Sequence, residues 1–283
     1  MRDDIVTGDL QLRIMQISDL HFGPPFLPEV AEAALASCIR LSPDVLVVSG
    51  DLTQRARREQ FEAARDYLAR FPSIPQMVIP GNHDVPLYDV ARRLRDPHRN
   101  YRQIINPELN TVLRVPGAVL VGLDSTAPRT AISNGRIYNW QLEFCAQAFA
   151  QSPPDATRIV VAHHHFAPAP DTLNDARMPK SQRAINTFNE LGVELIMGGH
   201  LHRAYIGNSL DFYPGEHRER GIIIAQSGTT TSRRGRGREA EKNTFNLIEL
   251  CDGTFKITHY LYFDGEQGFV ANSQHLFRRW RGR

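Results

Sequence analysis

The residues best suited to chemistry in this sequence are Asp, Asn and His side chains that directly follow short apolar runs. They occur at five places along the chain, at residues 19–21, 51, 82–84, 163–165 and 200–202. These places hold seven of the eleven histidines, a concentration that histidines with unrelated structural roles would not produce. We therefore expect the five segments to build one site.

The residue types in these segments are typical of a site for divalent metal ions. Oxygen and imidazole ligands suit Zn, Mn or Fe(II), and no thiolate lies among them to favour a softer metal. In the D-x-H pair Asp19–His21 and the H-x-H pair His200–His202, alternate side chains fall on one side of an extended backbone, so each pair can meet one ion. Two ions ~3.5–4 Å apart can bridge a hydroxide and stabilise both oxygens of an in-line phosphoryl displacement. Such a site needs a shared carboxylate, and Asp51 is the candidate.

The apolar runs before these residues are predicted to be buried strands. Each run is short and rich in Val, Ile, Leu or Met; the runs are 12–18, 44–50, 76–81, 118–124, 158–163 and 194–199. Helices are expected between them at 28–41, 57–71 and 139–151, the last with Asn139 as its N-cap. Strands that alternate with helices indicate an α/β fold with much parallel sheet, in which ligands gather at the carboxyl ends of the strands.

The last part of the chain changes character. Segments 221–228, 243–250 and 254–263 read as consecutive strands, with Asp252–Gly253 as a hairpin turn between the last two. We expect a second, antiparallel-leaning sheet packed on the same core. No linker or repeat separates it from the rest, so we interpret 1–283 as a single domain, with the motifs in a core of about 10–250 and C-terminal strands at about 221–263.

Composition restricts the class of protein. The chain has 283 residues, of which 41% are hydrophobic, and a net charge of +2, which gives no argument for nucleic acid as a partner. Three cysteines set far apart in apolar contexts favour buried, reduced thiols. No signal peptide and no membrane span is recognisable, so we expect a cytoplasmic protein without stable membrane insertion, its oligomeric state left open.

Five blocks of sequence together resemble the calcineurin-like metallophosphoesterase family, in its class III cyclic-nucleotide phosphodiesterase-like branch. They are D-x-H at 19–21, G-D-L-T at 50–53, G-N-H-D at 81–84, a histidine cluster at 163–165 and G-G-H-L-H at 198–202, in the family's order. The segment G-R-x-x-x-x-Q-L at 135–142 is also similar to that branch. One departure is that relatives usually read H-H-P where this chain reads His163, His164, His165 and Phe166.

The resemblance implies a four-layer α/β/β/α sandwich of two mixed sheets flanked by helices, the metallo-dependent phosphatase fold. It also implies two divalent ions, Mn, Fe or Zn. One would be held by Asp19, His21, Asp51 and His202, and the other by Asp51, Asn82, His200 and a histidine of the 163–165 cluster. Strand alignment favours His163 as that ligand, with His164 on the substrate side. His83 would face the substrate as a catalytic group, and Asp84 would orient it.

The resulting functional hypothesis is a binuclear-metal phosphoesterase acting on a small phosphate ester, with phosphodiesters preferred and cyclic nucleotides as one candidate. The attacking group would be a metal-bridging hydroxide. Alternatives are a phosphomonoesterase, a lipid or nucleotide pyrophosphate hydrolase, and a non-catalytic metal-binding scaffold. A scaffold would be expected to have lost ligands, whereas every expected ligand type is present in this chain. A nuclease is a further alternative, but it would need a basic groove, and the near-neutral net charge argues against one.

Two loops are the candidates for contact with substrate. Segment 166–182 is long, Pro-rich and next to the histidine cluster, so we predict that it lines or covers the pocket. The Gly/Arg run at 232–239 is usually a solvated loop, but arginine forks also suit phosphate.

Overall fold

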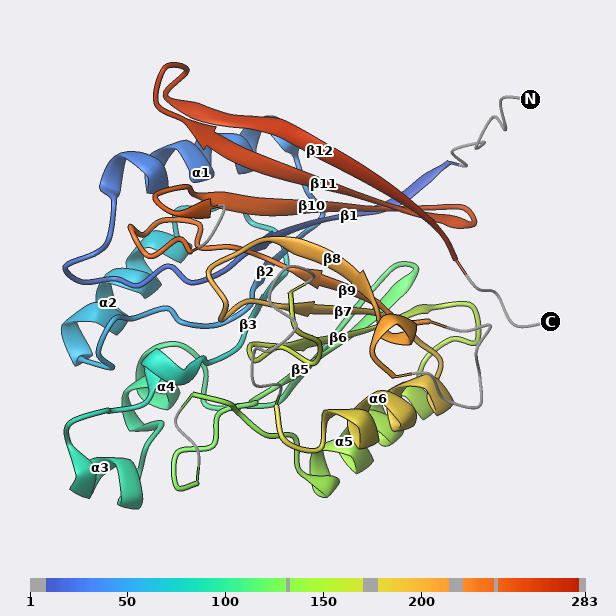
Figure 1. Cartoon of the computed structure of the whole chain (residues 1–283), viewed down its shortest axis with the longest axis horizontal. Helices are drawn as coiled ribbons and strands as arrows, with labels where there is room; N and C mark the ends of the chain where they lie inside the picture. The colour runs from blue at the N-terminus through green and yellow to red at the C-terminus, as the bar shows by residue number, and fades with distance from the viewer. Residues whose placement is uncertain (1–8, 131–132, 170–177, 214–220, 237–238, 280–283) are drawn as a thin grey trace.

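Two six-stranded sheets lie face to face in the computed structural model, which describes residues 9–130, 133–169, 178–213, 221–236 and 239–279 (Figure 1). The first sheet has the order β12-β11-β10-β1-β2-β3. Its strands are β1 (Leu10–Ile17), β2 (Val45–Val48), β3 (Gln76–Val78), β10 (Thr244–Cys251), β11 (Thr254–Phe263) and β12 (Gly268–Arg278). Strands β1 to β3 are parallel, and β10 to β12 extend the sheet from β1 in antiparallel pairs.

The second sheet has the order β4-β5-β6-β7-β9-β8. Its strands are β4 (Thr111–Val115), β5 (Ala118–Leu123), β6 (Thr157–Ala162), β7 (Val193–Gly198), β8 (Tyr205–Asn208) and β9 (Ile223–Gln226). The four central strands β5, β6, β7 and β9 are parallel, while β4 and β8 are antiparallel edges. Both sheets are therefore mixed, and each has a parallel part whose carboxyl ends can carry a site.

Three apolar clusters hold the layers together. One lies between the sheets and joins β1 and β2 to β5, β6, β7 and β9. A second packs α1 (Pro28–Leu41) and α2 (Arg58–Leu68) on the outer face of the first sheet. A third packs α5 (Asn139–Ala150) and α6 (Ser181–Glu190) on the outer face of the second. The layer order is helix, sheet, sheet, helix, which confirms the predicted four-layer α/β/β/α sandwich.

The six strands and three helices expected before residue 200 are all present, but the expectation for the C-terminal part is wrong. The strand expected at 221–228 is β9, which pairs in parallel with β7 in the second sheet. The strands expected at 243–250 and 254–263 are β10 and β11, which join the first sheet. The C-terminal strands are therefore divided between both sheets, because β1 and β7 each offered an unpaired edge.

Several elements were not predicted. The edge strands β4, β8 and β12 and the helices α3 (Val90–Arg95), α4 (Arg99–Ile104) and α6 are short or polar, so they carry little hydrophobic periodicity. Helix α5 begins at Asn139 as expected, but Tyr138 and not Asn139 is its N-cap, since the Gln141 side chain accepts the Tyr138 backbone N–H at 2.9 Å. Within the described ranges, no helix is both long and apolar enough to cross a bilayer.

A buried polar network joins the two sheets near the ends of β1 and β7. The Gln16 amide donates to the Gly198 carbonyl oxygen at 2.8 Å and to Ser49 Oγ at 3.2 Å. Its oxygen accepts from the Asn246 amide at 2.9 Å. Gln16 is fully buried, so each of these bonds replaces one with water. The network fixes β1 against β7 and β10 where the polar segments begin.

We predict that Gln16→Leu lowers the free energy of unfolding by about 1–3 kcal/mol, because it leaves buried polar groups without their partner. Urea unfolding followed by circular dichroism measures this. The matched control is Gln274→Leu on the exposed face of β12, which should change stability by less than about 0.5 kcal/mol. Equal effects of the two substitutions would contradict a structural role for the network.

Candidate metal centre

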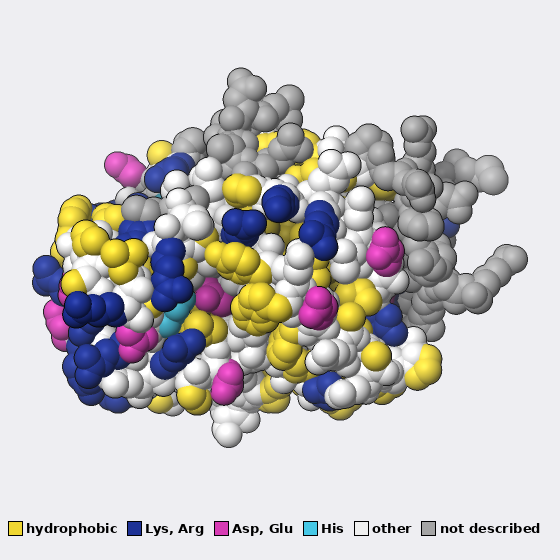
Figure 2. Space-filling model, turned by 90° about the horizontal axis from the view of Figure 1, so that it is seen from below, with side chains coloured by type: hydrophobic (Ala, Val, Ile, Leu, Met, Phe, Trp, Pro, Cys, Tyr) yellow, Lys and Arg dark blue, Asp and Glu magenta, His cyan; other side chains and the backbone are white. Residues whose placement is uncertain are grey.

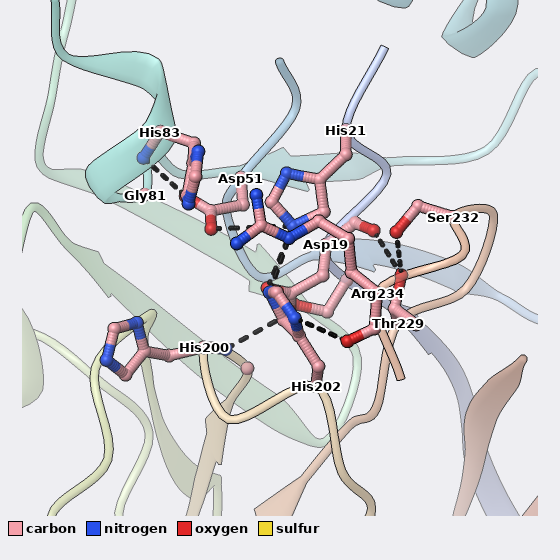
Figure 3. A network of polar contacts seen from close by, with 12 residues as sticks. Asp19, His21, Asp51, Gly81, His83, His200, His202, Thr229, Ser232 and Arg234 are labelled. Atoms are coloured by element: carbon pink, nitrogen blue, oxygen red, sulfur yellow. Dashed lines mark hydrogen bonds and ion pairs between the residues drawn. The ribbon is translucent and has the colours of Figure 1, made fainter. Parts of the chain in front are cut away.

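The polar segments predicted from the sequence meet at the carboxyl ends of parallel strands from both sheets. Asp19 and His21 follow β1, Asp51 follows β2, and Asn82 opens the short 3-10 helix η1 (Asn82–Asp84) after β3. From the second sheet, the 163–165 cluster follows β6, and 200–202 follows β7. The two sheets thus each contribute part of one buried cluster, which Figure 3 shows from close by.

The two carboxylates of this cluster are held in the same way. Asp19 Oδ2 accepts hydrogen bonds from Ser18 Oγ at 2.7 Å and from the His200 backbone N–H at 3.1 Å. Asp51 Oδ1 accepts from the His83 backbone N–H at 2.8 Å. The other oxygens, Asp19 Oδ1 and Asp51 Oδ2, are buried and accept no hydrogen bond. Each carboxylate is therefore fixed by one oxygen and presents the other to the cluster.

Backbone carbonyls orient two of the imidazoles. His202 Nδ1 donates to the Arg234 carbonyl oxygen, and His163 Nδ1 donates to the Ser49 carbonyl oxygen, both at 2.8 Å. A carbonyl oxygen only accepts, so Nδ1 carries a proton in each ring and Nε2 is the nitrogen that faces the cluster. Such bonds to the outer nitrogen are the usual way in which proteins orient metal-binding histidines.

The first group of facing atoms comprises Asp19, His21, Asp51 and His202, whose potential ligand atoms all lie within 4.8 Å of one another. His202 Nε2 lies 3.1 Å from Asp19 Oδ1 and 3.0 Å from His21 Nε2. All four side chains are buried. This is the set that the resemblance assigned to one ion.

The second group lies around Asn82. His163 Nε2 is 3.2 Å from Asn82 Oδ1 and 3.4 Å from Asp51 Oδ2, while His200 Nδ1 is 2.9 Å from Asn82 Oδ1. Asp51 Oδ2 is also 3.8 Å from His21 Nε2. The same carboxylate oxygen therefore faces both groups, as a shared ligand would.

The electrostatics of the cluster favour a bound cation. Burial alone would raise the pKa of Asp19, yet the imidazole of His202 and its neighbours hold it well below its usual range. Burial lowers the pKa of His21 to about 4. For His163, burial is outweighed by the charge of Asp51, which raises the pKa to about 9. Two ionised, buried carboxylates thus attract positive charge, and a divalent ion bound to the imidazole nitrogens would take the place of the proton that Asp51 favours on His163.

The backbone adopts uncommon conformations to bring these side chains together. Five of the candidate ligands have positive φ, between 52° and 76°: Asp19, His21, Asp51, His200 and His202. Left-handed conformations of non-glycine residues cost free energy and cluster at functional sites. The glycines of the motifs give room: a Cβ on Gly81 would lie 2.2 Å from Asp51 Oδ1, and one on Gly199 would lie 2.5 Å from Asp19 Oδ2.

The structure corrects the role expected for Asp84. Its carboxylate accepts hydrogen bonds from the backbone N–H groups of Leu52, Thr53 and Gly81, and from Thr53 Oγ1, all within 3.1 Å. Burial and the charge of Asp51 raise the pKa of Asp84 to about 7. It therefore ties the loops after β2 and β3 together and does not orient the His83 ring, which donates through Nδ1 to the Gln54 carbonyl oxygen at 3.0 Å.

His164 differs from the expectation of a substrate-facing residue. Its side chain is fully buried, with Nδ1 2.8 Å from Ser125 Oγ. Gly135 has a φ of +64° and lies so close that a Cβ there would be 2.3 Å from the ring. His163 is the residue that reaches Asp51 and Asn82. The similarity at 135–142 therefore reflects packing against His164 and the capping of α5.

A run of hydroxyl residues after β9 supports the site and was not predicted from the sequence. Thr229 Oγ1 donates to the Asp19 carbonyl oxygen at 2.7 Å, and Thr231 Oγ1 donates to the Leu20 carbonyl oxygen at 2.9 Å. The Ser18 backbone N–H donates to Thr230 Oγ1 at 3.0 Å. Three consecutive threonines in the sequence were the available signal. They hold the backbone of the Asp19–His21 loop in its left-handed conformation.

The two loops predicted to contact substrate are only partly described. Of 166–182, residues 170–177 lie outside the described residues, and Phe166, Ala167 and Ala169 at its start are buried. Of 232–239, residues 237–238 lie outside them. Arg234 extends from this second loop toward Asp51 and His21 (Figure 3), and the charges of Asp51 and Asp19 act on it. The run is therefore not only a solvated loop.

Comparison with known proteins identifies the class. The sequence matches the calcineurin-like phosphoesterase family over residues 12–204, which is more than half of the chain. The protein therefore belongs to this family, and it is a metal-dependent phosphoester hydrolase.

Two curated relatives are similar to this chain. A protein of Synechococcus sp. named as a probable cyclic nucleotide phosphodiesterase is 27% identical over 223 residues, which cover 73% of this chain and 79% of that protein. The 3',5'-cyclic adenosine monophosphate phosphodiesterase CpdA of Escherichia coli K12 is 24% identical over 216 residues, which cover 70% of this chain and 72% of CpdA.

Solved structures support the fold alone. A purple acid phosphatase from yellow lupin superposes with a TM-score of 0.71 at 12% identity, covering 96% of this chain but only 54% of that one. A dimetal phosphatase from Danio rerio has a TM-score of 0.66 at 11% identity and covers 96% of this chain and 100% of its own.

We predict that Gly81→Ala weakens metal binding by about 10- to 100-fold, because the added methyl group displaces the Asp51 carboxylate while removing no ligand. Equilibrium dialysis against Mn(II), with metal counted by mass spectrometry, measures this. The control is Gly265→Ala, where a Cβ meets no atom within 4 Å. Unchanged metal affinity in Gly81→Ala would show that Asp51 is not a ligand in this position.

Proposed function

We propose that this protein hydrolyses phosphodiesters at a centre of two divalent ions, with 3',5'-cyclic nucleotides as the first substrates to test. The observation that carries the proposal is the position of Asp51 Oδ2, which is buried, accepts no hydrogen bond and faces both groups of candidate ligands. Preference for a diester is supported by the two relatives that are named as cyclic nucleotide phosphodiesterases.

The proposed ligands follow the two groups. Asp19, His21, Asp51 and His202 would hold one ion, and Asp51, Asn82, His163 and His200 the other. Bound there, the ions would activate water and polarise the phosphate oxygens. Mn, Fe and Zn all suit these ligand types, so metal availability would select among them.

His83 is the proposed group that meets the substrate. Its ring lies edge-on to His21, with 4.8 Å between ring centroids. Nδ1 is occupied by the Gln54 carbonyl, which leaves Nε2 to meet a phosphate or leaving-group oxygen. Burial lowers the pKa of His83, so its ring is more readily neutral than a solvated imidazole. Asp84 acts as a positioning residue for the loops on either side.

The surface charge of the molecule suits an anionic ester. Figure 2 shows the face of the molecule that lies at the bottom of Figure 1. On this face, Lys and Arg side chains gather where α3 and α4 lie, with fewer acidic side chains among them. A histidine side chain reaches the surface there. Arg95, Arg99 and Arg102 are exposed on these helices. Positive potential beside a site raises the local concentration of an anionic substrate.

The three cysteines are buried and unpaired, which supports the proposal of a reducing, cytoplasmic location.

The test compares bis(p-nitrophenyl) phosphate with p-nitrophenyl phosphate, using metal-depleted protein reloaded with Mn(II). We expect the diester to turn over faster than the monoester. We also expect cyclic AMP to be opened to AMP, a conversion that chromatography measures. Asp51→Asn should lower kcat/KM by more than about 100-fold, since it replaces the shared carboxylate with a neutral amide. The exposed Asp155→Asn is the matched control.

Two outcomes would change the proposal. Faster turnover of the monoester would assign a phosphatase to the same site. Normal activity of Asp51→Asn would contradict the two-metal centre itself.

A further inference from the structure

Arg234 has an unusual environment for an arginine beside two carboxylates. Its side chain is half-buried, whereas its neighbour Arg233 is exposed. Burial lowers the pKa of Arg234, while the charges of Asp51 and Asp19 oppose that shift. Within the described part of the chain, however, its guanidinium forms no salt bridge. Its hydrogen-bond partner is the uncharged Gln54 side chain, whose Oε1 accepts from Nη1 at 3.0 Å.

Gln54 links Arg234 to His83. Its side-chain oxygen holds the guanidinium, and its carbonyl oxygen accepts the His83 Nδ1–H at 3.0 Å. Gln54 is itself buried, and its backbone N–H donates to the Phe22 carbonyl oxygen at 3.0 Å. One rigid residue therefore sets the positions of a guanidinium and an imidazole at the edge of the metal centre.

This arrangement leaves the other donors of Arg234 available, since only Nη1 donates to Gln54. A guanidinium has five N–H donors in a fork that matches two oxygens of a phosphate group. If Arg234 served to neutralise Asp19 and Asp51, it would bond to their free oxygens, but those oxygens accept no hydrogen bond. An amide partner positions a guanidinium without cancelling its charge. The charge is therefore kept for a ligand.

We propose that Arg234 binds a non-bridging oxygen of the substrate phosphate and that Gln54 is the positioning residue for it. This inference rests on the proposed function and adds a phosphate-binding residue to it. The ligand is the phosphate group shared by the ester and by the inorganic ion. Arg234 thus supplies a positive charge from the chain beside the first ligand group, where its own carbonyl oxygen accepts from His202 Nδ1.

The test is a binding measurement, so that it does not depend on turnover. Inorganic phosphate is titrated into the Mn(II)-loaded protein in a calorimeter, and metal content is determined for each variant. We expect Arg234→Ala to weaken phosphate binding by about 10- to 100-fold, the loss of a hydrogen bond to a charged group, with metal content unchanged. The phosphate affinity of Arg234→Lys should fall between those of the wild type and Arg234→Ala, because lysine keeps the charge but lacks the forked donors of a guanidinium.

Arg233→Ala is the matched control, since it lies in the same loop with its side chain exposed, and it should bind phosphate as the wild type does. Guanidinium ion added to Arg234→Ala should partly restore binding. Wild-type phosphate affinity in Arg234→Ala, or loss of its metal, would overturn the proposal. If the wild type proved inactive on phosphate esters while Arg234→Ala still weakened phosphate binding, the proposed function alone would be overturned.

A double-mutant cycle tests the role of Gln54. Gln54→Leu removes the side-chain acceptor but keeps the carbonyl that holds His83. We expect it to weaken phosphate binding in the wild-type background and to have no further effect in Arg234→Ala, because the two residues act through one contact. Additive losses would show that Gln54 acts by another route and would overturn its assignment as the positioning residue.

Discussion

The structure depends on bringing two buried carboxylates together with their free oxygens facing inward. Asp19 Oδ1 and Asp51 Oδ2 are without hydrogen bonds in an interior where such oxygens are normally satisfied. Imidazoles surround them, and the Nδ1 proton of His202 and of His163 is turned outward to a carbonyl. The two buried carboxylates attract positive charge, and their free oxygens together with the inward-facing imidazole nitrogens suit a divalent cation.

The fold can maintain this arrangement because the site lies at the ends of strands that are mostly buried. The left-handed residues of the site cost of order 1–3 kcal/mol each, so the surrounding structure must outweigh a destabilising cluster. The apolar clusters on both faces of each sheet provide that stability. Hydrogen bonds from Thr229 and Thr231 then fix the loop backbone locally, and Ser18 holds the Asp19 carboxylate. Each strand therefore has two parts with different roles. Its apolar residues pack in the core and stabilise the fold, and the residues after its carboxyl end provide the candidate ligands.

Much of this could be read from the sequence, for an identifiable reason. Strands buried on both faces form continuous apolar runs, and chemistry at their ends leaves Asp, Asn and His directly after them, as at Asp19 and Asp51. The edge strands β4, β8 and β12 have no such signal, since half of each faces solvent. Which sheet a C-terminal strand joins is decided by a free edge far away in the sequence. For that reason β9 and β10 were placed wrongly although both were recognised as strands.

The roles of individual site residues were harder to predict because they depend on contacts made across the fold. Asp84 was expected beside His83, its neighbour in the chain, but its carboxylate turns to the backbone of Leu52 and Thr53. His163 and His164 are adjacent and identical in type. Only the direction of each side chain from the end of β6 separates them, one toward Asp51 and the other toward Ser125.

The loop after β9 joins two parts of the site that the sequence motifs treat separately. The carbonyl oxygen of Arg234 orients the His202 ring, while its side chain extends toward Asp51 and is held by Gln54. One residue therefore contacts a candidate metal ligand through its backbone and the proposed phosphate position through its side chain. A displacement of this loop would disturb both at once. The position of this one residue therefore bears on the candidate metal ligand and on the proposed phosphate position together.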